Sequence, residues 1–341
     1  MKDILLDDFK YVLSSNLNWE KLSGKVVLVT GGTGFIGSLI IRYLNFLNDY
    51  KYDIKVIAIV RDVAKAEFMY HDSKVKLIKG DVCNLPLIKD KVDFIFHCAA
   101  TTRSKDMVEH PTEVSGGIVN GTMNICKLAN EKQVKSMVYL SSMEVYGATS
   151  KGMQILTEND LGSIEILNTR SCYSLGKRMA ENICYSYYVE YNVPIKIARL
   201  AQTFGAGILP EENRVFAQFA KSVIENRDII LHTMGDSRGN YCYSADSIVA
   251  IFKLLLEGED GEAYNIVNEE TSMTIFEMAE LVAQKIAKNR IKVIIDIANQ
   301  HNYGFAPKTE IRLSAEKMKQ LGWKPTIGLL EAYQRMIKWL N

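Results

Sequence analysis

The sequence lacks the closely spaced cysteine and histidine pairs from which most zinc sites are built. Its six cysteines include no CxxC pair, and its five histidines include no HxxxH pair. A structural metal or a disulfide framework is therefore not expected. Scattered single cysteines are typical of free thiols in a reducing compartment, which predicts a cytoplasmic protein.

Long apolar runs and an excess of one charge are also missing. No apolar run approaches the roughly 20 residues of a membrane span. The N-terminal stretch MKDILLDDFKYVL carries acids where a signal peptide would have a basic start. The formal net charge of +1 leaves no basic stripe for nucleic acid and no polybasic tail for a membrane, so we expect neither partner.

Apolar strands alternate with helical patterns over the N-terminal part of the chain. Strand-like runs lie at 25–31, 55–62, 75–82, 92–100, 135–142 and 194–201, with helical patterns at about 35–47, 117–131 and 173–191. Short strands that are apolar almost throughout indicate a parallel sheet covered on both faces. The βαβαβ order predicts an α/β protein with a Rossmann-like doubly wound sheet.

After about residue 204 the pattern changes and the loops lengthen. Helices are expected at about 213–226 and 274–288, with short strands at 228–232 and 292–296. We predict a Rossmann domain of residues 23–203 and 241–265, and a smaller α/β substrate-binding domain of residues 204–240 and 266–341. Residues 1–22 are expected to form an N-terminal helical extension packed on the surface.

Three glycines, Gly31, Gly34 and Gly37, join the first strand of the sheet to its first helix. Glycines at such a junction let a pyrophosphate approach the backbone and lie on the helix N-terminus. A tight turn with a glycine for helix packing is the alternative explanation, since the spacing is GxxGxxG rather than GxGxxG. We predict a dinucleotide site here, with Thr33, Phe35 and Ile36 completing the turn.

The ends of the next strands are predicted to contact the same cofactor. A basic residue after the second strand accommodates the 2′-phosphate of NADP, whereas an acid there binds the 2′-hydroxyl of NAD. Here Arg61 is followed by Asp62, so NAD(P) stays undecided and Arg61 favours NADP. Further cofactor contacts are expected from Asp81, Val82, Ala99 and Ala100, whereas His97 is expected to be structural.

The segment YSLGK places Tyr173 and Lys177 four residues apart, on one face of the expected helix. A tyrosine hydroxyl ordinarily has a pKa near 10. A neighbouring ammonium favours the phenolate and lowers that pKa, which suits a catalytic base. A serine in SSMEVYG, residues 141–147, ends the preceding strand and could hold a substrate hydroxyl.

In this order, the motifs resemble the extended short-chain dehydrogenase/reductase family, in particular its NAD-dependent nucleotide-sugar epimerases, dehydratases and decarboxylases. The resemblance covers residues 24 to about 335 and includes ARLAQTFGAG (198–207), GEAYNIVNEETSMTIFEMAELV (261–282) and LGWKP (321–325). It implies a homodimer formed through the helices near 117–131 and 173–191. The usual setting of the family is cell-surface polysaccharide biosynthesis.

The resemblance also implies roles for the site residues. Tyr173 would be the base that removes the proton of the sugar C4 hydroxyl, and Lys177 would lower the pKa of Tyr173 and bind the nicotinamide ribose. Ser142 would share the hydrogen bond of that hydroxyl while hydride transfer leaves a 4-keto sugar. Glu144 stands where related dehydratases remove the C5 proton. Substrate contacts are expected from Thr101, Ser142, Gln202, Arg214, Val215 and Arg238.

Three positions depart from the family pattern. Met143 stands where related dehydratases carry the acid that protonates the leaving hydroxyl, and Gln202 stands where relatives carry Asn. Gly239, with Arg238 one residue earlier, stands where decarboxylases carry an arginine. These departures suggest a substrate outside the commonest set.

We therefore predict an NAD(P)-dependent enzyme that oxidises a nucleotide-activated sugar at C4 and then epimerises or dehydrates it. The alternatives are an NDP-4-keto-sugar reductase, which Arg61 favours, and a UDP-glucuronate decarboxylase. A non-enzymatic alternative is a dinucleotide-sensing scaffold protein. Such proteins usually lose the tyrosine or the lysine, and this chain has both.

Overall fold

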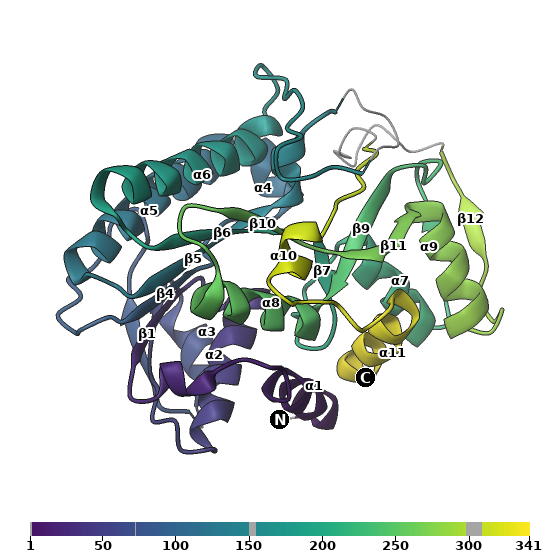
Figure 1. Cartoon of the computed structure of the whole chain (residues 1–341). Helices are drawn as coiled ribbons and strands as arrows, with labels where there is room; N and C mark the ends of the chain where they lie inside the picture. Colours follow the sequence, from purple (N-terminus) through teal and green to yellow (C-terminus); the bar gives the residue numbers. More distant parts are fainter. Residues whose placement is uncertain (1, 72, 150–154, 298–308) are drawn as a thin grey trace.

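A parallel sheet of seven strands lies at the centre of the computed structural model, which describes residues 2–71, 73–149, 155–297 and 309–341 (Figure 1). The strand order is β10-β6-β5-β4-β1-β2-β3, which reverses beside β1 as in doubly wound folds. The predicted Rossmann-like fold is thereby confirmed. The strands are β1 (Val26–Thr30), β2 (Lys55–Val60), β3 (Val75–Lys79), β4 (Phe94–His97), β5 (Ser136–Ser142), β6 (Ile195–Leu200) and β10 (Ala263–Ile266).

Helices cover both faces of this sheet because successive strand residues point to opposite sides. Val27 and Val29 belong to one apolar cluster, and Leu28 between them belongs to the other. The first cluster includes side chains of α1 (Asp3–Leu13), α2 (Phe35–Asn48), α3 (Val63–Tyr70) and α8 (Ser244–Glu257). The second includes side chains of α4 (Ser104–Glu109), α5 (Pro111–Lys132) and α6 (Ser171–Tyr191).

Local sequence sets where the long helices α5 and α6 begin and end. Proline occupies the first position of α5, where its missing N–H costs nothing. The residues after the two helices, Gln133 and Asn192, adopt left-handed backbone conformations that stop the helical ladder. The two helices lie side by side along one face of the sheet (Figure 1). This packing carries the segment 173–177 to the end of β5.

The remaining strands form two small sheets beside the large one (Figure 1). One contains β7 (Gln202–Phe204), β9 (Arg238–Tyr243) and β11 (Asn268–Thr274), and the other contains β8 (Ile229–Leu231) and β12 (Val293–Ile295). The chain returns to the seven-stranded sheet with β10, which pairs with β6. The division into two domains at residues 203, 240 and 265 remains a prediction. The other elements are η1 (Trp19–Leu22), η2 (Met143–Tyr146), α7 (Val215–Ile224), α9 (Ile275–Leu281), the π-helical turn Val282–Ile286, α10 (Glu316–Gln320) and α11 (Leu329–Leu340).

The N-terminal helix is more deeply integrated than the expected surface extension. Phe9 and Val12 are buried in the same apolar cluster as α2 and α8. Asp8, with 2% of its surface exposed, accepts a hydrogen bond of 2.6 Å from Tyr243 and another of 2.6 Å from Arg335. The helix therefore joins β9 to α11. In the described part of the chain, no helix is long and apolar enough to cross a membrane.

Candidate active site

The glycine turn lies at the carboxyl end of β1 and leads into α2. Gly31 has φ of 69°, and a Cβ there would lie 2.8 Å from the backbone nitrogen of Ala99. A Cβ on Gly37 would overlap the carbonyl oxygen of Gly31. Close packing within the chain therefore accounts for two of the three glycines. A Cβ on Gly34 would meet one atom of the described residues within 4 Å, the carbonyl oxygen of Gly31 at 3.2 Å.

The N-terminus of α2 has the properties of an anion site. Gly34 is its N-cap and has no side chain to accept from the first-turn N–H groups, and no acid lies in the first turn. Those N–H groups and the helix dipole are thus left to a bound anion. A dinucleotide pyrophosphate fits this arrangement. Thr33 lies in the turn itself, and Phe35 and Ile36 are the first two residues of the helix.

His97 is buried between two threonines, as a structural histidine would be. Its Nδ1 lies 2.7 Å from Thr30 Oγ1, and its Nε2 lies 3.3 Å from Thr122 Oγ1. Burial lowers the pKa of His97 to about 3, so the ring is neutral. Thr30 also accepts a hydrogen bond from the backbone N–H of Ala99. These contacts fix the backbone of Ala99 and Ala100 beside the glycine turn.

Arg61 and Asp81 lie together at the ends of β2 and β3. Their side chains approach to 3.9 Å, and 77% of the Arg61 side chain is exposed. Asp62 accepts a hydrogen bond of 2.9 Å from the backbone N–H of Lys65 and so caps α3. The backbone oxygen of Val82 accepts a hydrogen bond from Asn124 on α5. Of the two residues after β2, Arg61 therefore has the side chain more available to a ligand, because the side chain of Asp62 caps α3.

Tyr173 and Lys177 share one face of α6 at the end of β5. Tyr173 is buried, and the ammonium of Lys177 lies 5.8 Å from the centroid of its ring. Lys177 donates a hydrogen bond of 2.6 Å to the backbone oxygen of Leu140 and also lies over the ring of Tyr139. Burial lowers the pKa of Lys177 to about 8.

The pKa of Tyr173 is raised to about 12, chiefly by burial and then by the negative charge of Glu144. A hydrogen bond with Ser142 and the positive charges of Arg214 and Arg170 oppose that rise. Ser142, Arg214 and Arg170, rather than Lys177, are thus the groups that most strongly lower the pKa of Tyr173. The predicted effect of Lys177 on this pKa remains a prediction.

Glu144 lies in η2, directly after β5, and forms an ion pair that the sequence did not indicate. Arg170 binds both of its carboxylate oxygens, with Nη1–Oε2 at 3.0 Å and Nη2–Oε1 at 3.1 Å. Ser174 donates a third hydrogen bond of 3.3 Å to Oε2. Arg170 and Glu144 are 26 residues apart, so spacing along the chain gave no signal of this pair.

Two of the departures from the family pattern lie opposite each other. A Cβ on Gly239 would lie 3.7 Å from the terminal methyl of Met143. Met143 is buried, and neither residue brings a titratable group to this place. These two positions therefore meet in an apolar contact.

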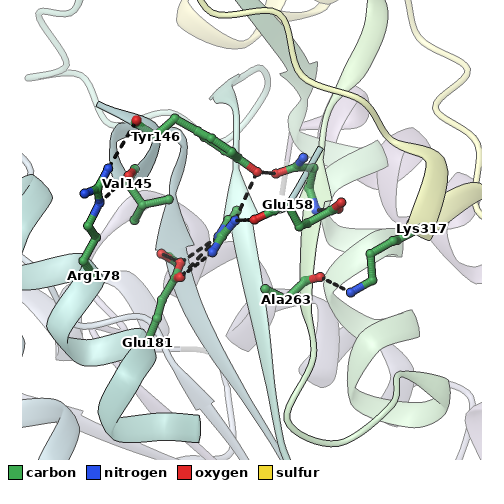
Figure 2. A network of polar contacts seen from close by, with 10 residues as sticks. Val145, Tyr146, Glu158, Arg178, Glu181, Ala263 and Lys317 are labelled. Atoms are coloured by element: carbon green, nitrogen blue, oxygen red, sulfur yellow. Dashed lines mark hydrogen bonds and ion pairs between the residues drawn. The ribbon is translucent and has the colours of Figure 1, made fainter. Parts of the chain in front are cut away.

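A buried polar network behind the site fixes the turn that carries these residues (Figure 2). Arg199 on β6 is 2.7 Å from Glu181 on α6 and donates to the Tyr146 hydroxyl at 3.2 Å. Tyr146 in turn donates to Asn265 at 2.6 Å. Arg178 donates to the backbone oxygen of Val145 at 2.6 Å. The network joins α6, β6 and β10 to the turn after Ser142.

The predicted substrate residues lie on different elements. Arg214 directly precedes α7 and binds both oxygens of Glu212, at 3.0 and 2.7 Å, and its positive charge also lowers the pKa of Tyr173. Arg238 on β9 is instead bound to Glu277 at 2.9 Å and to the backbone oxygen of Ser272. Thr101 follows β4, Gln202 begins β7 and Val215 begins α7.

The chain is similar to known nucleotide-sugar enzymes and to a solved epimerase. A mouse dTDP-D-glucose 4,6-dehydratase is 28% identical over 330 residues, covering 92% of this chain and 88% of that protein. An Arabidopsis thaliana UDP-glucuronic acid decarboxylase is 30% identical over 313 residues, covering 91% and 87%. A solved epimerase from Methanothermobacter thermautotrophicus has a TM-score of 0.78 at 22% identity, covering 98% of this chain and 95% of that one.

A family model matches most of the sequence. It spans residues 27–267, from β1 to the end of β10, and describes the NAD-dependent epimerase/dehydratase family. The non-enzymatic alternative of a scaffold is therefore not retained. The chain is an enzyme that belongs to the NAD-dependent epimerase/dehydratase family.

Proposed function

We propose that this protein oxidises C4 of a nucleotide-activated sugar with enzyme-bound NAD(P) and then epimerises or dehydrates the 4-keto sugar. The observation that supports it best is the buried Tyr173, which lies next to Ser142 and shares a helix face with Lys177. Fold alone would not specify chemistry. Tyrosine, serine and lysine at one strand end suit the removal of a hydroxyl proton.

The glycine turn between Gly31 and Gly37 would hold the pyrophosphate of the cofactor, and Lys177 would bind its nicotinamide ribose. When bound, the cofactor accepts the hydride that leaves C4 and returns it in a later step. Tyr173 takes the proton of the C4 hydroxyl, and Ser142 orients that hydroxyl. Lys177, on the same face of α6, would stabilise the phenolate form of Tyr173 through its ammonium.

The second step is proposed to occur at C5. A C4 carbonyl acidifies the C5–H bond, and the Glu144 carboxylate can accept that proton while the electron pair is delocalised onto the C4 oxygen. Dehydration would also need a donor for the leaving hydroxyl at C6, and Met143 has none. Epimerisation is therefore favoured over dehydration.

Decarboxylation is the second candidate, because a UDP-glucuronic acid decarboxylase is 30% identical and Glu144 is present. Gly239 has no side chain to supply the arginine of that reaction, which argues against decarboxylation.

A reductase that consumes NADPH is the third candidate, supported by the exposed Arg61. Binding constants for NAD and NADP, compared between the wild type and Arg61→Ala, test the cofactor choice. A preference for NADP that disappears in the variant supports the reductase.

The test of the proposed function is mass spectrometry of products formed from UDP-, dTDP-, GDP- and CDP-sugars in heavy water. An unchanged formula with altered configuration is the result expected for an epimerase. Loss of water with deuterium gained would indicate a dehydratase, and loss of CO2 a decarboxylase. If no sugar is changed and no bound cofactor is reduced, the proposal is wrong.

A homodimer through α5 and α6 is proposed as well. Met123 on α5 and Met179 and Tyr185 on α6 are large apolar side chains that are 44–51% exposed. Exposed apolar side chains gathered on one helix pair favour association. Light scattering of the wild type and of Met179→Glu tests it. A two-fold interface brings the same patch of both subunits together, so the two added carboxylates would repel each other and weaken the dimer.

A further inference from the structure

The Glu144 carboxylate is held more firmly than a solvated carboxylate at a strand end would be. Arg170 contacts both of its oxygens, and Ser174 contacts one of them. The side chains are partly buried, with 16% of Arg170 and 32% of Glu144 exposed. A planar guanidinium that pairs with both oxygens fixes the orientation of a carboxylate as well as its charge.

Glu144 can still accept a proton while it is paired with Arg170. The two oxygens of a carboxylate offer about four lone pairs in all. Three are used by Arg170 and Ser174. One position on Oε1 is left, and it is the acceptor that proton removal from a substrate would need.

Arg170 itself has a donor that nothing satisfies. Its Nε is buried and has no hydrogen-bond partner within the described ranges. Buried donors are nearly always paired in folded proteins. The contacts of Arg170 with Glu144 thus use its two Nη atoms alone, which sets the guanidinium plane against the carboxylate.

The same ion pair also reaches Tyr173. The charge of Glu144 raises the pKa of Tyr173, and the charge of Arg170 lowers it. Arg170 thus opposes the rise in the pKa of Tyr173 that the Glu144 carboxylate causes. A chain with Glu144 and without Arg170 would have a less acidic tyrosine.

We propose that Arg170 is a positioning residue, which holds the Glu144 carboxylate toward the substrate so that it can remove the proton at C5. The inference rests on the proposed function. In this step the C5–H bond breaks and its proton passes to Glu144. The electron pair forms the C4–C5 double bond of an enolate, and return of a proton to C5 regenerates the ketone.

The experiment compares Arg170→Gln, Arg170→Lys and the wild type with dTDP-glucose and UDP-glucuronate as probes in heavy water. Reduction of bound cofactor reports oxidation at C4, and deuterium at C5 reports the step assigned to Glu144. The control is Arg335→Gln on α11, which removes another arginine–glutamate pair, here with two nitrogens on one oxygen of Glu331, together with a contact to Asp8. Thermal unfolding of each variant accompanies both measurements.

We expect Arg170→Gln to lower deuterium exchange at C5 about 100-fold, since small misplacements of a reacting group cost this much. Oxidation at C4 should change much less. The C5 exchange rate of Arg170→Lys should lie between those of the wild type and Arg170→Gln, because lysine keeps the charge without the planar guanidinium that binds both oxygens. Arg335→Gln should leave both steps near the wild-type rate.

Unchanged C5 exchange in Arg170→Gln would overturn the inference. Equal loss of both steps, with the unfolding temperature lowered, would reduce Arg170 to a structural role and overturn it as well. Wild-type protein that reduces its cofactor with neither probe contradicts the proposed function itself. Cofactor reduction without C5 exchange in the wild type overturns the inference and leaves C4 epimerisation in place.

Discussion

The ammonium of Lys177 lies 5.8 Å from the centroid of the Tyr173 ring, one helical turn along α6. It is fixed there by the backbone oxygen of Leu140 at 2.6 Å. The lysine is therefore placed beside the phenol ring and bound to the strand that ends in Ser142. The contact of Lys177 with Leu140 thus ties the segment of α6 that carries Tyr173, the proposed base, to β5.

Replacing Tyr173 by Phe should slow oxidation at C4 by about 10²–10⁴-fold, the usual contribution of a positioned base. Stopped-flow absorbance of reduced cofactor in a single turnover measures this step. Tyr187→Phe on the same helix removes a hydroxyl outside the proposed site and serves as the control. Full turnover by Tyr173→Phe would show that another group is the base.

The rate of C4 oxidation in the wild type should rise with pH up to about 8. The pKa of Tyr173 is raised to about 12, so the phenolate fraction grows tenfold for each pH unit below that value. The pKa of Lys177 is lowered to about 8, so its ammonium is present below pH 8 and is lost above it. The rise should weaken above pH 8. A flat profile from pH 6 to 8 would contradict this.

Glu144→Gln should move the pH profile of C4 oxidation toward lower pH. The negative charge of Glu144 raises the pKa of Tyr173, and its removal leaves a more acidic phenol. The same variant should lose deuterium exchange at C5. Single-turnover cofactor reduction at several pH values measures the shift. A profile displaced toward higher pH would mean that Glu144 does not act on Tyr173 through its charge.

Gly37→Ala should destabilise the protein by about 1–3 kcal/mol, the usual cost of overpacking. The added methyl would overlap the carbonyl oxygen of Gly31 and displace the turn, so NAD binding should weaken too. Urea unfolding and calorimetric titration with NAD measure the two effects. Gly117→Ala on α5 is the matched control, because no atom of the residues that the structure describes lies within 4 Å of its added methyl. Equal behaviour of the two variants would argue against close packing at the turn.

The stability of the fold should fall as pH rises through about 6. Burial raises the pKa of Asp8 from 3.8 to about 6, so the folded protein binds a proton that the unfolded chain releases. This contribution is fully present below pH 4 and is lost as pH rises through 6. The loss is on the order of 2–3 kcal/mol.

Urea midpoints at pH 4 to 7 should therefore show a steeper decline for the wild type than for Asp8→Asn, which does not titrate. Asp3→Asn changes an exposed acid on the same helix and should follow the wild type. Identical slopes for the wild type and Asp8→Asn would rule out Asp8 as the source of the decline.

Local chemistry made much of the molecule predictable from its sequence. Apolar strands alternating with helices indicated the parallel sheet, because burial on both faces demands such runs. Glycines after β1 indicated a close turn, and the spacing of Tyr173 and Lys177 placed both on one helix face. Each of these inferences depends on neighbours within a few residues, and sequence alone determined them.

Tertiary structure decided what depends on contacts between distant segments. Arg170 and Glu144 are 26 residues apart and meet only because α6 packs against the end of β5. Gly239 on β9 lies against Met143 in the turn after β5, and Asp8 is buried where β9 and α11 contact it. Spacing along the chain carries no record of such approaches, since they follow from how helices and sheets pack after their local structure is set.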